Sequence, residues 1–435
     1  MDPDPGRRRA PREGRRLLAD AAPRSARRPD ARPALCRPRH LRPAARGVSP
    51  AGSRARRNFS GRRLIRVLEL TTTTAPGGGP RQVYDLARRL PRSEFEVTVA
   101  GPRDGPFFER FRALGLTAVE VPTGGPGPGA LLATVRLIRK LGIEVVHTHG
   151  KGAGLHGRLA ARWTGVAAVH TFHGIHYESY RRPLQPLYLG LERRLARWTH
   201  TVIHVSPTQA AEARRLGLAG SDPSVTVING VDLDEQDRRV AASPLSRAGL
   251  GLGADWAVLG TVARFDPVKR LDALVDALQF LNRRDVALLL VGDGPEATRL
   301  RRRVAATGLG ARVVFAGWLD DPARVSPALD LYVAASLKEG LPLAVLEAMG
   351  AGLAVVATDV PGHRDVVAVG ETGLLVPPGD ARALARGIGA LLDDPERRAR
   401  MGRAGRARVA REFALQPMVA KTAEIYRAAA ASSLR

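Results

Sequence analysis

Residues 64–90 read LIRVLELTTTTAPGGGPRQVYDLARRL, and this order of residue types indicates the fold class. The apolar run at 64–70 precedes four threonines and three adjacent glycines, Gly77, Gly78 and Gly79, and apolar side chains then return at helical spacing. The pattern predicts a buried strand, a glycine-rich loop and an amphipathic helix. Such a loop lets the backbone approach a ligand, and the helix that follows offers free amides to an anion. The same glycines also suit a plain tight turn, so both interpretations stay open.

Similar strand and helix patterns alternate along the rest of the chain. In the first half, strands are predicted at 64–70, 95–100, 144–147, 167–170, 201–205 and 225–228, and helices at 81–90, 130–141 and 187–198. After a polar stretch at 233–253, strands are predicted at 257–262, 286–291, 312–315, 331–334, 353–358 and 374–376, and helices at 395–413 and 418–430. Such alternation predicts an α/β protein with two facing Rossmann-like domains. Ligands of such sheets bind in the cleft beyond the carboxyl ends of the strands.

Charge is distributed unevenly along the 435 residues, whose formal net charge is +26. Such a charge would suit nucleic acid or an anionic membrane. Residues 1–63, however, hold 19 Arg and five acidic residues, so the other 372 residues carry only +12. Nine prolines and few apolar residues at 1–62 predict a disordered tail. A non-catalytic binder that grips nucleic acid with this tail is one alternative function, although the chain has no recognisable reading module.

The predicted domains follow from these patterns. They are the tail at 1–62, a first Rossmann-like domain at 63–235, a second Rossmann-like domain at 236–413 and a closing helix at 414–435. The single cysteine, Cys36, excludes a disulfide within the chain and a cysteine-based zinc site. No run of 18 apolar residues occurs, which excludes a spanning helix of that kind. The expected location is the cytoplasm, with peripheral contact at the inner face of the cell membrane as an open alternative.

The most specific stretch is SLKEGLPLAVLEAMG at 336–350. Pro342 suits the first position of a helix, which places Glu339 in the preceding loop and Glu347 about one and a half turns into the helix. Both carboxylates can then face one ligand, and they can accept hydroxyl hydrogen bonds from a sugar ring and a ribose. An acid that favours the helix dipole plus an ordinary helical glutamate would give the same pattern.

Two cations follow the first strand of the second series, in the stretch GTVARFDPVKR at 260–270. Arg264 and Lys269 could converge on a diphosphate, the arginine as a bidentate fork and the lysine as a point charge. Placed there, they would stabilise a departing diphosphate. Two solvated charges on a surface turn are the alternative.

Eight of the ten histidines fall between residues 147 and 204. A metal site is conceivable at the pair His147 and His149 and at the triplet His170, His173 and His176. Their spacing lacks the helical His-Glu-x2-His pattern and no acid is well placed nearby, so no metal is expected. His149 and His173 are instead predicted to end strands at the cleft and to donate hydrogen bonds to sugar or phosphate. The other histidines are interpreted as structural.

Taken together, these motifs resemble glycosyltransferase family 4, whose fold, GT-B, consists of two facing Rossmann-like domains. The resemblance spans about residues 63–427. It implies that the domain at 63–235 binds the acceptor, that the domain at 236–413 binds the nucleotide sugar, and that the helix at 414–435 returns to the first domain. Its carriers are the Glu-x7-Glu pair Glu339 and Glu347, with further signatures at 228–232 (INGVD), 291–295 (VGDGP), 354–358 (AVVAT), 362–366 (GHRDV) and 370–380 (GETGLLVPPGD).

The resemblance implies roles for individual residues. Gly77 and Gly78 would shape the donor phosphate and acceptor region, Arg264 and Lys269 would hold the donor diphosphate, and His173 would approach the donor sugar. Glu339 would contact the transferred sugar and Glu347 the ribose, and Gly340, Leu341 and Asn229 would join the donor-binding residues. Two positions depart from the family pattern: Gly79-Pro80 stands where a small residue and then Glu are usual, and Asp365 replaces a Glu.

The implied reaction is a retaining transfer from a nucleotide diphosphate sugar, with no metal or cofactor required. The partners implied are a nucleotide-sugar donor and a glycan or polyprenyl-linked acceptor of bacterial surface polysaccharide or glycolipid synthesis, and no specific nucleic acid. Basic and aromatic residues at 169–182 and at Arg193, Arg194 and Arg197 suit an anionic bilayer, or equally a solvated helix face over core aromatics. A nucleotide-sugar 2-epimerase of the same fold is a further alternative.

Overall fold

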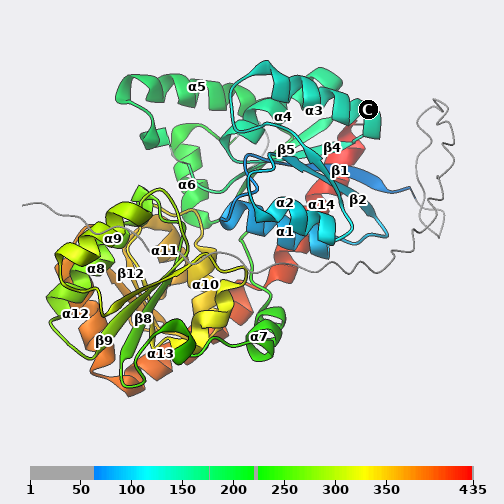
Figure 1. Ribbon diagram of the computed structural model, residues 1–435. Coiled ribbons are helices and arrows are strands. Elements are labelled where there is room, and N and C mark those ends of the chain that lie inside the picture. The colour runs from blue at the N-terminus through cyan, green and yellow to red at the C-terminus, as the bar shows by residue number, and fades with distance from the viewer. Residues whose placement is uncertain (1–62, 176, 220–223, 434–435) are drawn as a thin grey trace, which may run out of the picture. The chain divides into compact units, whose positions relative to one another are not determined.

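The computed structural model describes residues 63–175, 177–219 and 224–433. These residues form two parallel sheets, each covered by helices on both faces (Figure 1). The predicted α/β class with two Rossmann-like domains is therefore confirmed. The tail predicted at 1–62 lies outside the described residues.

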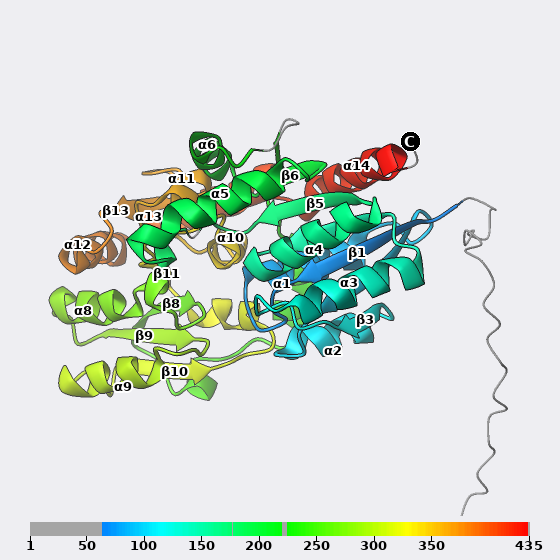
Figure 2. The ribbon, with the colours of Figure 1, turned by 90° about the horizontal axis from the view of Figure 1, so that it is seen from above.

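The first sheet has the strand order β3-β2-β1-β4-β5-β6-β7, and every pairing is parallel. Helices α3 and α4 cover one of its faces, as Figure 2 shows, while α1, α2 and α14 pack on the other. Its elements are β1 Ile65–Thr71, α1 Gly78–Arg89, β2 Phe95–Gly101, α2 Pro106–Ala113, β3 Thr117–Glu120, α3 Pro128–Leu141, β4 Val145–His149, α4 Lys151–Thr164, β5 Ala167–Phe172, α5 Gln185–Ala196, β6 Thr201–His204, α6 Pro207–Leu216 and β7 Val225–Thr226.

The second sheet has the order β10-β9-β8-β11-β12-β13, again with parallel pairing throughout. Helices α8, α9 and α12 cover one face, and α10, α11 and α13 cover the other. Its elements are β8 Ala257–Val262, α8 Leu271–Leu281, β9 Val286–Val291, α9 Ala297–Ala306, β10 Val313–Gly317, β11 Leu331–Ala334, α10 Leu343–Gly350, β12 Val355–Thr358, α11 Pro361–Val366, β13 Gly373–Val376, α12 Ala381–Leu392 and α13 Pro395–Glu412.

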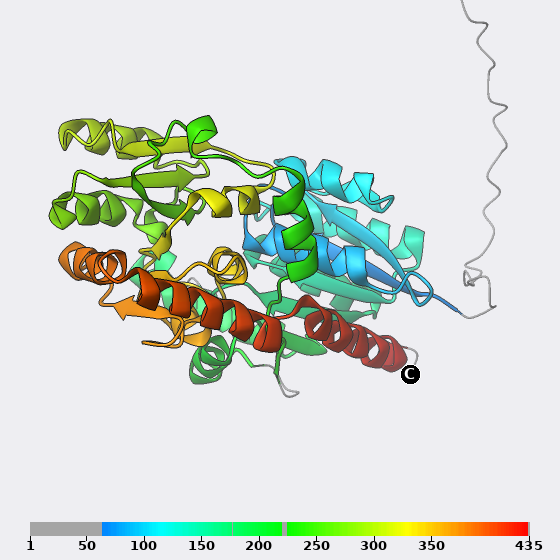
Figure 3. The same cartoon turned by 90° about the horizontal axis from the view of Figure 1, so that it is seen from below.

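The last helix, α14 Leu415–Ser433, packs on the first sheet although the chain has just completed the second. Figure 3 shows α14 continuing from α13 along the molecule. Its buried face contacts β1, β4 and β5. Tyr426 of α14 is fully buried there. The C-terminal helix therefore brings a phenol group beneath the strands of the first sheet.

Some elements of the structure differ from those predicted. The strand β3 and the helices α2, α4, α6, α9, α11 and α12 were not predicted, and the polar stretch at 233–253 contains a helix, α7 Leu233–Ala242. Helix α4 escapes a search for apolar spacing because its buried face consists largely of small residues. It lies so close to the sheet that a Cβ on Gly157 would come within 2.3 Å of Thr148 Cγ2. None of the described helices is long and apolar enough to cross a membrane.

Candidate active site

A cavity of about 790 Å³ is lined by loops that follow strands of both sheets. This is where parallel α/β sheets bind ligands, and the volume is typical of a small-molecule site. All ten residues predicted from the sequence line it. The first domain contributes Gly77, Gly78, His173 and Asn229, and the second contributes Arg264, Lys269, Glu339, Gly340, Leu341 and Glu347.

A lysine–glutamate ion pair lies in the second domain's wall of the cavity. Glu339 Oε1 accepts hydrogen bonds from Lys269 Nζ at 2.6 Å and from Ser336 Oγ at 2.6 Å. Burial alone would raise the pKa of the Glu339 carboxyl, but the Lys269 ammonium, together with His363 and the Ser336 hydroxyl, holds the pKa below its usual range. The pair is therefore a carboxylate beside a cation at neutral pH.

Arg264 supplies the second cation of the predicted pair. It follows β8 directly, and its side chain is 53% exposed. Its Nε donates to Asp266 Oδ2 at 2.5 Å. Because a guanidinium carries five N–H groups, four remain on the terminal nitrogens. Arg264 and Lys269 thus line one cavity, as an anionic ligand would require.

Glu347 lies on α10, which begins at Leu343. Pro342 is the residue before the helix, so the predicted helix start was one residue early. Burial raises the pKa of the Glu347 carboxyl above its ordinary value. Its Oε1 lies 3.7 Å from Arg81 of α1, so an ion pair connects the two domains across the cavity.

Two glycines permit close approach around His173. A Cβ on Gly79 would lie 3.3 Å from the His173 ring. A Cβ on Gly340 would lie only 2.4 Å from the His173 carbonyl oxygen. The loop after β11 therefore meets the loop after β5 backbone to backbone, and a side chain at Gly340 would push the two domains apart.

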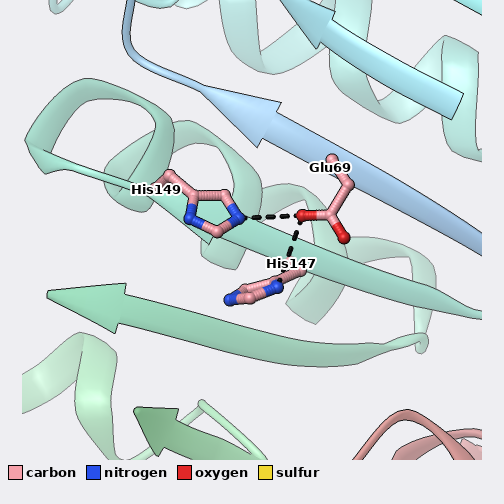
Figure 4. Close-up of side chains that lie close together, drawn as sticks. All are labelled: Glu69, His147 and His149. Carbon is pink, nitrogen blue, oxygen red and sulfur yellow. Dashed lines mark hydrogen bonds and ion pairs between the residues drawn. The ribbon is translucent and has the colours of Figure 1, made fainter. Parts of the chain in front are cut away.

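Beneath His173, two of the histidines lie beside an acid, which corrects the expectation that no acid is well placed near them. Glu69 of β1 pairs in register with His147 of β4, so their side chains share one face of the sheet. Glu69 Oε2 lies 2.8 Å from His149 Nε2 and 3.4 Å from His147 Nδ1 (Figure 4). Burial opposes ionisation of Glu69, yet the two imidazoles hold its pKa well below the usual range.

The histidines differ in their surroundings. His149 lines the cavity, but its Nε2 contacts Glu69 and its Nδ1 lies 3.0 Å from His173 Nε2, so the prediction that it donates to a ligand is wrong. Burial and the neighbouring imidazole of His147 lower the pKa of His149 to about 4. His170 is a buried structural histidine, with its Nδ1 2.7 Å from Thr148 Oγ1. His176 lies outside the described residues.

Comparison with known proteins assigns the chain to a family. Residues 76–235 match the family model of "Glycosyltransferase Family 4", and residues 244–408 match that of "Glycosyl transferases group 1". A phosphatidyl-myo-inositol mannosyltransferase of Mycolicibacterium smegmatis is 31% identical over 74% of this chain and 83% of its own length. The chain belongs to glycosyltransferase family 4.

Further similarities agree with this family 4 assignment. The UDP-Gal:alpha-D-GlcNAc-diphosphoundecaprenol alpha-1,3-galactosyltransferase of Escherichia coli is 28% identical over 70% of this chain and 82% of its own length. The crystal structure of Anabaena HepE in complex with UDP-glucose has the same fold, with a TM-score of 0.73 at 22% identity over 84% of this chain and all of HepE. The protein is therefore a glycosyltransferase with the GT-B fold.

Three residues at the site of this glycosyltransferase, Glu69, Arg81 and Ser336, are hard to recognise from the sequence alone. Glu69 stands inside an apolar strand, where a single acid suggests an edge or an exposed position. Arg81 is one of 63 arginines. Ser336 is distinguished only by preceding Glu339 by three residues. The register of β1 and β4 was the missing information for Glu69, because that register joins residues 78 positions apart.

Proposed function

We propose that this glycosyltransferase moves a glycosyl unit, with retention of anomeric configuration, from a nucleoside diphosphate sugar to a lipid-linked acceptor at a membrane surface. The observation that carries the proposal is the single cavity in which Arg264 and the Lys269–Glu339 pair face His173 of the other domain. Two cations suit a diphosphate, and a carboxylate suits sugar hydroxyls.

The chemistry needs charge stabilisation more than proton transfer by the protein. The bond from the anomeric carbon to the phosphate oxygen breaks, and Lys269 and Arg264 stabilise the charge that develops on the leaving diphosphate. A bond from the anomeric carbon to the acceptor oxygen forms on the same face, and the acceptor proton passes to the departing phosphate. Glu339, already bonded to Lys269 and Ser336, suits an acceptor of sugar hydroxyl hydrogen bonds better than an attacking nucleophile.

A donor panel tests this proposal. We expect one nucleoside diphosphate sugar to stabilise the protein by about 2.7 kcal/mol at a hundred times its Kd, measured as a rise in Tm. Transfer to a lipid-linked sugar would then give a product whose anomeric configuration, read by NMR, matches that of the donor. An inverted product would contradict retention. Conversion of the donor to its 2-epimer without an acceptor would favour the epimerase alternative.

The proposal of a lipid-linked acceptor is supported by an exposed surface on α5 and on the residues that flank this helix, 181–184 and 197, which we call the α5 face. The leucines of this face stand one helical turn apart and are exposed by 47% at Leu184, 72% at Leu187 and 43% at Leu191. Five exposed arginines occur in the same segment: Arg181, Arg182, Arg193, Arg194 and Arg197. Glu192, the one acid at 181–197, is buried against Arg158 at 2.6 Å. Apolar side chains among cations suit an anionic bilayer.

The named relatives act on acceptors of the same kind. The Escherichia coli enzyme's name specifies a diphosphoundecaprenol-linked sugar, and the mycobacterial enzyme's name specifies phosphatidyl-myo-inositol. Both acceptors are membrane lipids. A surface that rests on the bilayer would bring the cavity to such a head group.

Vesicle binding tests the α5 face. Replacing Leu184, Leu187 and Leu191 together by glutamine should weaken binding to phosphatidylglycerol-containing vesicles by about tenfold or more, because less apolar surface enters the interface. Raising the salt concentration should weaken wild-type binding as well. Co-sedimentation measures both. Leu132→Gln, at a leucine of α3 that is 40% exposed, is the matched control. Equal binding by the triple variant and wild type would contradict the proposal.

A further inference from the structure

A buried chain of hydrogen bonds runs from Glu69 to the cavity. Glu69 Oε2 lies 2.8 Å from His149 Nε2, and His149 Nδ1 lies 3.0 Å from His173 Nε2. Glu69 is 0% exposed and His149 is 3% exposed, while His173 lines the cavity. Figure 4 shows the first of these links, between β1 and β4. This series of hydrogen bonds therefore joins a buried charge to a residue that lines the cavity.

The directions of these hydrogen bonds follow from the chemistry of the groups. An ionised carboxylate only accepts, so His149 must donate to Glu69 through Nε2–H. The Nδ1 of a neutral His149 then carries a lone pair and accepts from His173 Nε2–H. His173 is thereby held with its proton on Nε2, and its Nδ1 is left as an acceptor. One carboxylate selects the tautomers of two successive imidazoles.

Helix α14 holds the buried end of this series of hydrogen bonds, at Glu69. Tyr426 Oη donates to Glu69 Oε1 at 2.5 Å and accepts from His147 Nδ1 at 2.5 Å. His147 Nε2 in turn accepts from Thr171 Oγ1 at 2.7 Å. Both carboxylate oxygens of Glu69 and both ring nitrogens of His147 thus have partners. A network satisfied in this way holds its members in one arrangement.

We propose that Glu69 and His149 are positioning residues that fix His173 in one tautomer and orientation, so that His173 Nδ1 accepts a hydrogen bond from a hydroxyl of the bound glycosyl donor. The inference rests on the proposed donor site. Glu69 and His149 act through His173, which alone of the three would touch the substrate. The donor must then carry a free hydroxyl where its sugar meets the first domain.

A bound metal ion is the competing use of these side chains. One ligand atom each from Glu69, His147 and His149 lies within 4.8 Å of the others. A cation among them would have to displace the proton between His149 and Glu69 and the contact between His147 and Tyr426. Because the observed hydrogen bonds already satisfy these atoms, positioning is the interpretation that the geometry favours. Metal content is one outcome of the test.

The first experiment compares kcat and KM in Glu69→Gln. We expect kcat to fall by about 10- to 100-fold, because a misplaced His173 loses a contact to the reacting sugar, while the KM for the donor changes by less than about threefold. Thr148→Val is the matched control. Thr148 lies between His147 and His149 on β4, so its side chain points to the other face of the sheet. The substitution removes a buried hydroxyl that lies 2.7 Å from His170 Nδ1. Full activity in Glu69→Gln would overturn the proposal.

A double-variant cycle separates positioning from general stability. If Glu69 acts through His173, then Glu69→Gln should cost nothing further once His173→Ala is present. Additive losses would overturn the proposal. Should Glu69→Gln fail to fold, nitrogen NMR of ¹⁵N-histidine-labelled wild type still decides, because His149 and His173 should both carry their protons on Nε2. The opposite tautomers would overturn the proposal.

Two further outcomes complete the test. One equivalent of a transition metal in the purified protein, with activity lost to a chelator, would overturn positioning in favour of a metal site. Absence of turnover by wild type with every donor and acceptor tried would instead count against the proposed function. Failure of the inference is distinct, since it requires an active wild type and an equally active Glu69→Gln.

Discussion

Replacing Lys269 by methionine is expected to lower kcat by roughly 10²- to 10³-fold, the usual cost of removing one preorganised charge from a transition state. Lys269 Nζ lies 2.6 Å from Glu339 and lines the same cavity as Arg264. The substitution keeps most of the side chain's length and apolar stem but removes the cation that would face the departing diphosphate. Steady-state transfer assays with a saturating donor measure the loss.

The reciprocal substitution tests the same ion pair from the other side. Glu339→Gln should also reduce kcat, because an amide is a weaker acceptor for sugar hydroxyls and no longer holds Lys269 by charge. For Lys269→Met, the matched control is Lys421→Met, since Lys421 of α14 is a half-exposed lysine paired at 2.9 Å with Glu424 away from the cavity. A Lys269→Met enzyme that retained wild-type kcat would remove this residue from the mechanism.

The stability cost of Lys269→Met should stay moderate. Glu339 loses its cation but keeps Ser336, and its side chain is still 12% exposed. It can therefore take up a proton when Lys269 is absent, and the loss should lie below the roughly 3–5 kcal/mol of a fully buried broken pair. Folding at neutral pH is thus expected to persist, so the kinetic effect can be read without an unfolding artefact.

The residues predicted from the sequence share a property that made prediction possible. Arg264, Lys269, Glu339 and Glu347 all lie within 13 residues after the end of a strand of the second sheet, and parallel strands present such residues at one edge. Their chemistry was therefore readable from local order alone. Their roles in binding and catalysis stay predictions until the substitutions above are made.

Glu69 and α4 escaped prediction for a different physical reason. The histidine partners of Glu69 stand 78 and 80 positions later in the chain, and the sequence gives no local sign of which strands pair or in what register. Helix α4 buries glycine and alanine rather than the large apolar residues whose spacing marks a helix. In both cases the deciding contact is tertiary, between segments that a local pattern cannot relate.

Gly340→Ala is expected to reduce kcat/KM by about 100-fold while each domain still folds. The new Cβ would lie 2.4 Å from the His173 carbonyl oxygen, and the obstacle is backbone rather than a side chain that could rotate away. The least costly relief is a separation of the two domains by about an ångström. Such a displacement moves His173 away from Lys269 and Glu339, and errors of about 1 Å in the placement of catalytic groups cost on the order of 10²-fold.

The control for this effect is Gly310→Ala, in the loop before β10, where a Cβ would meet nothing within 4 Å. This substitution adds the same methyl group to the second domain, at a position that does not contact the first domain. Its kcat/KM and Tm should therefore match those of wild type. A Gly340→Ala enzyme with normal kcat/KM would mean that the domains need not meet at His173 for transfer. Loss of kcat/KM with an unchanged Tm would instead locate the requirement at the contact between the domains, because the packing within each domain is left intact.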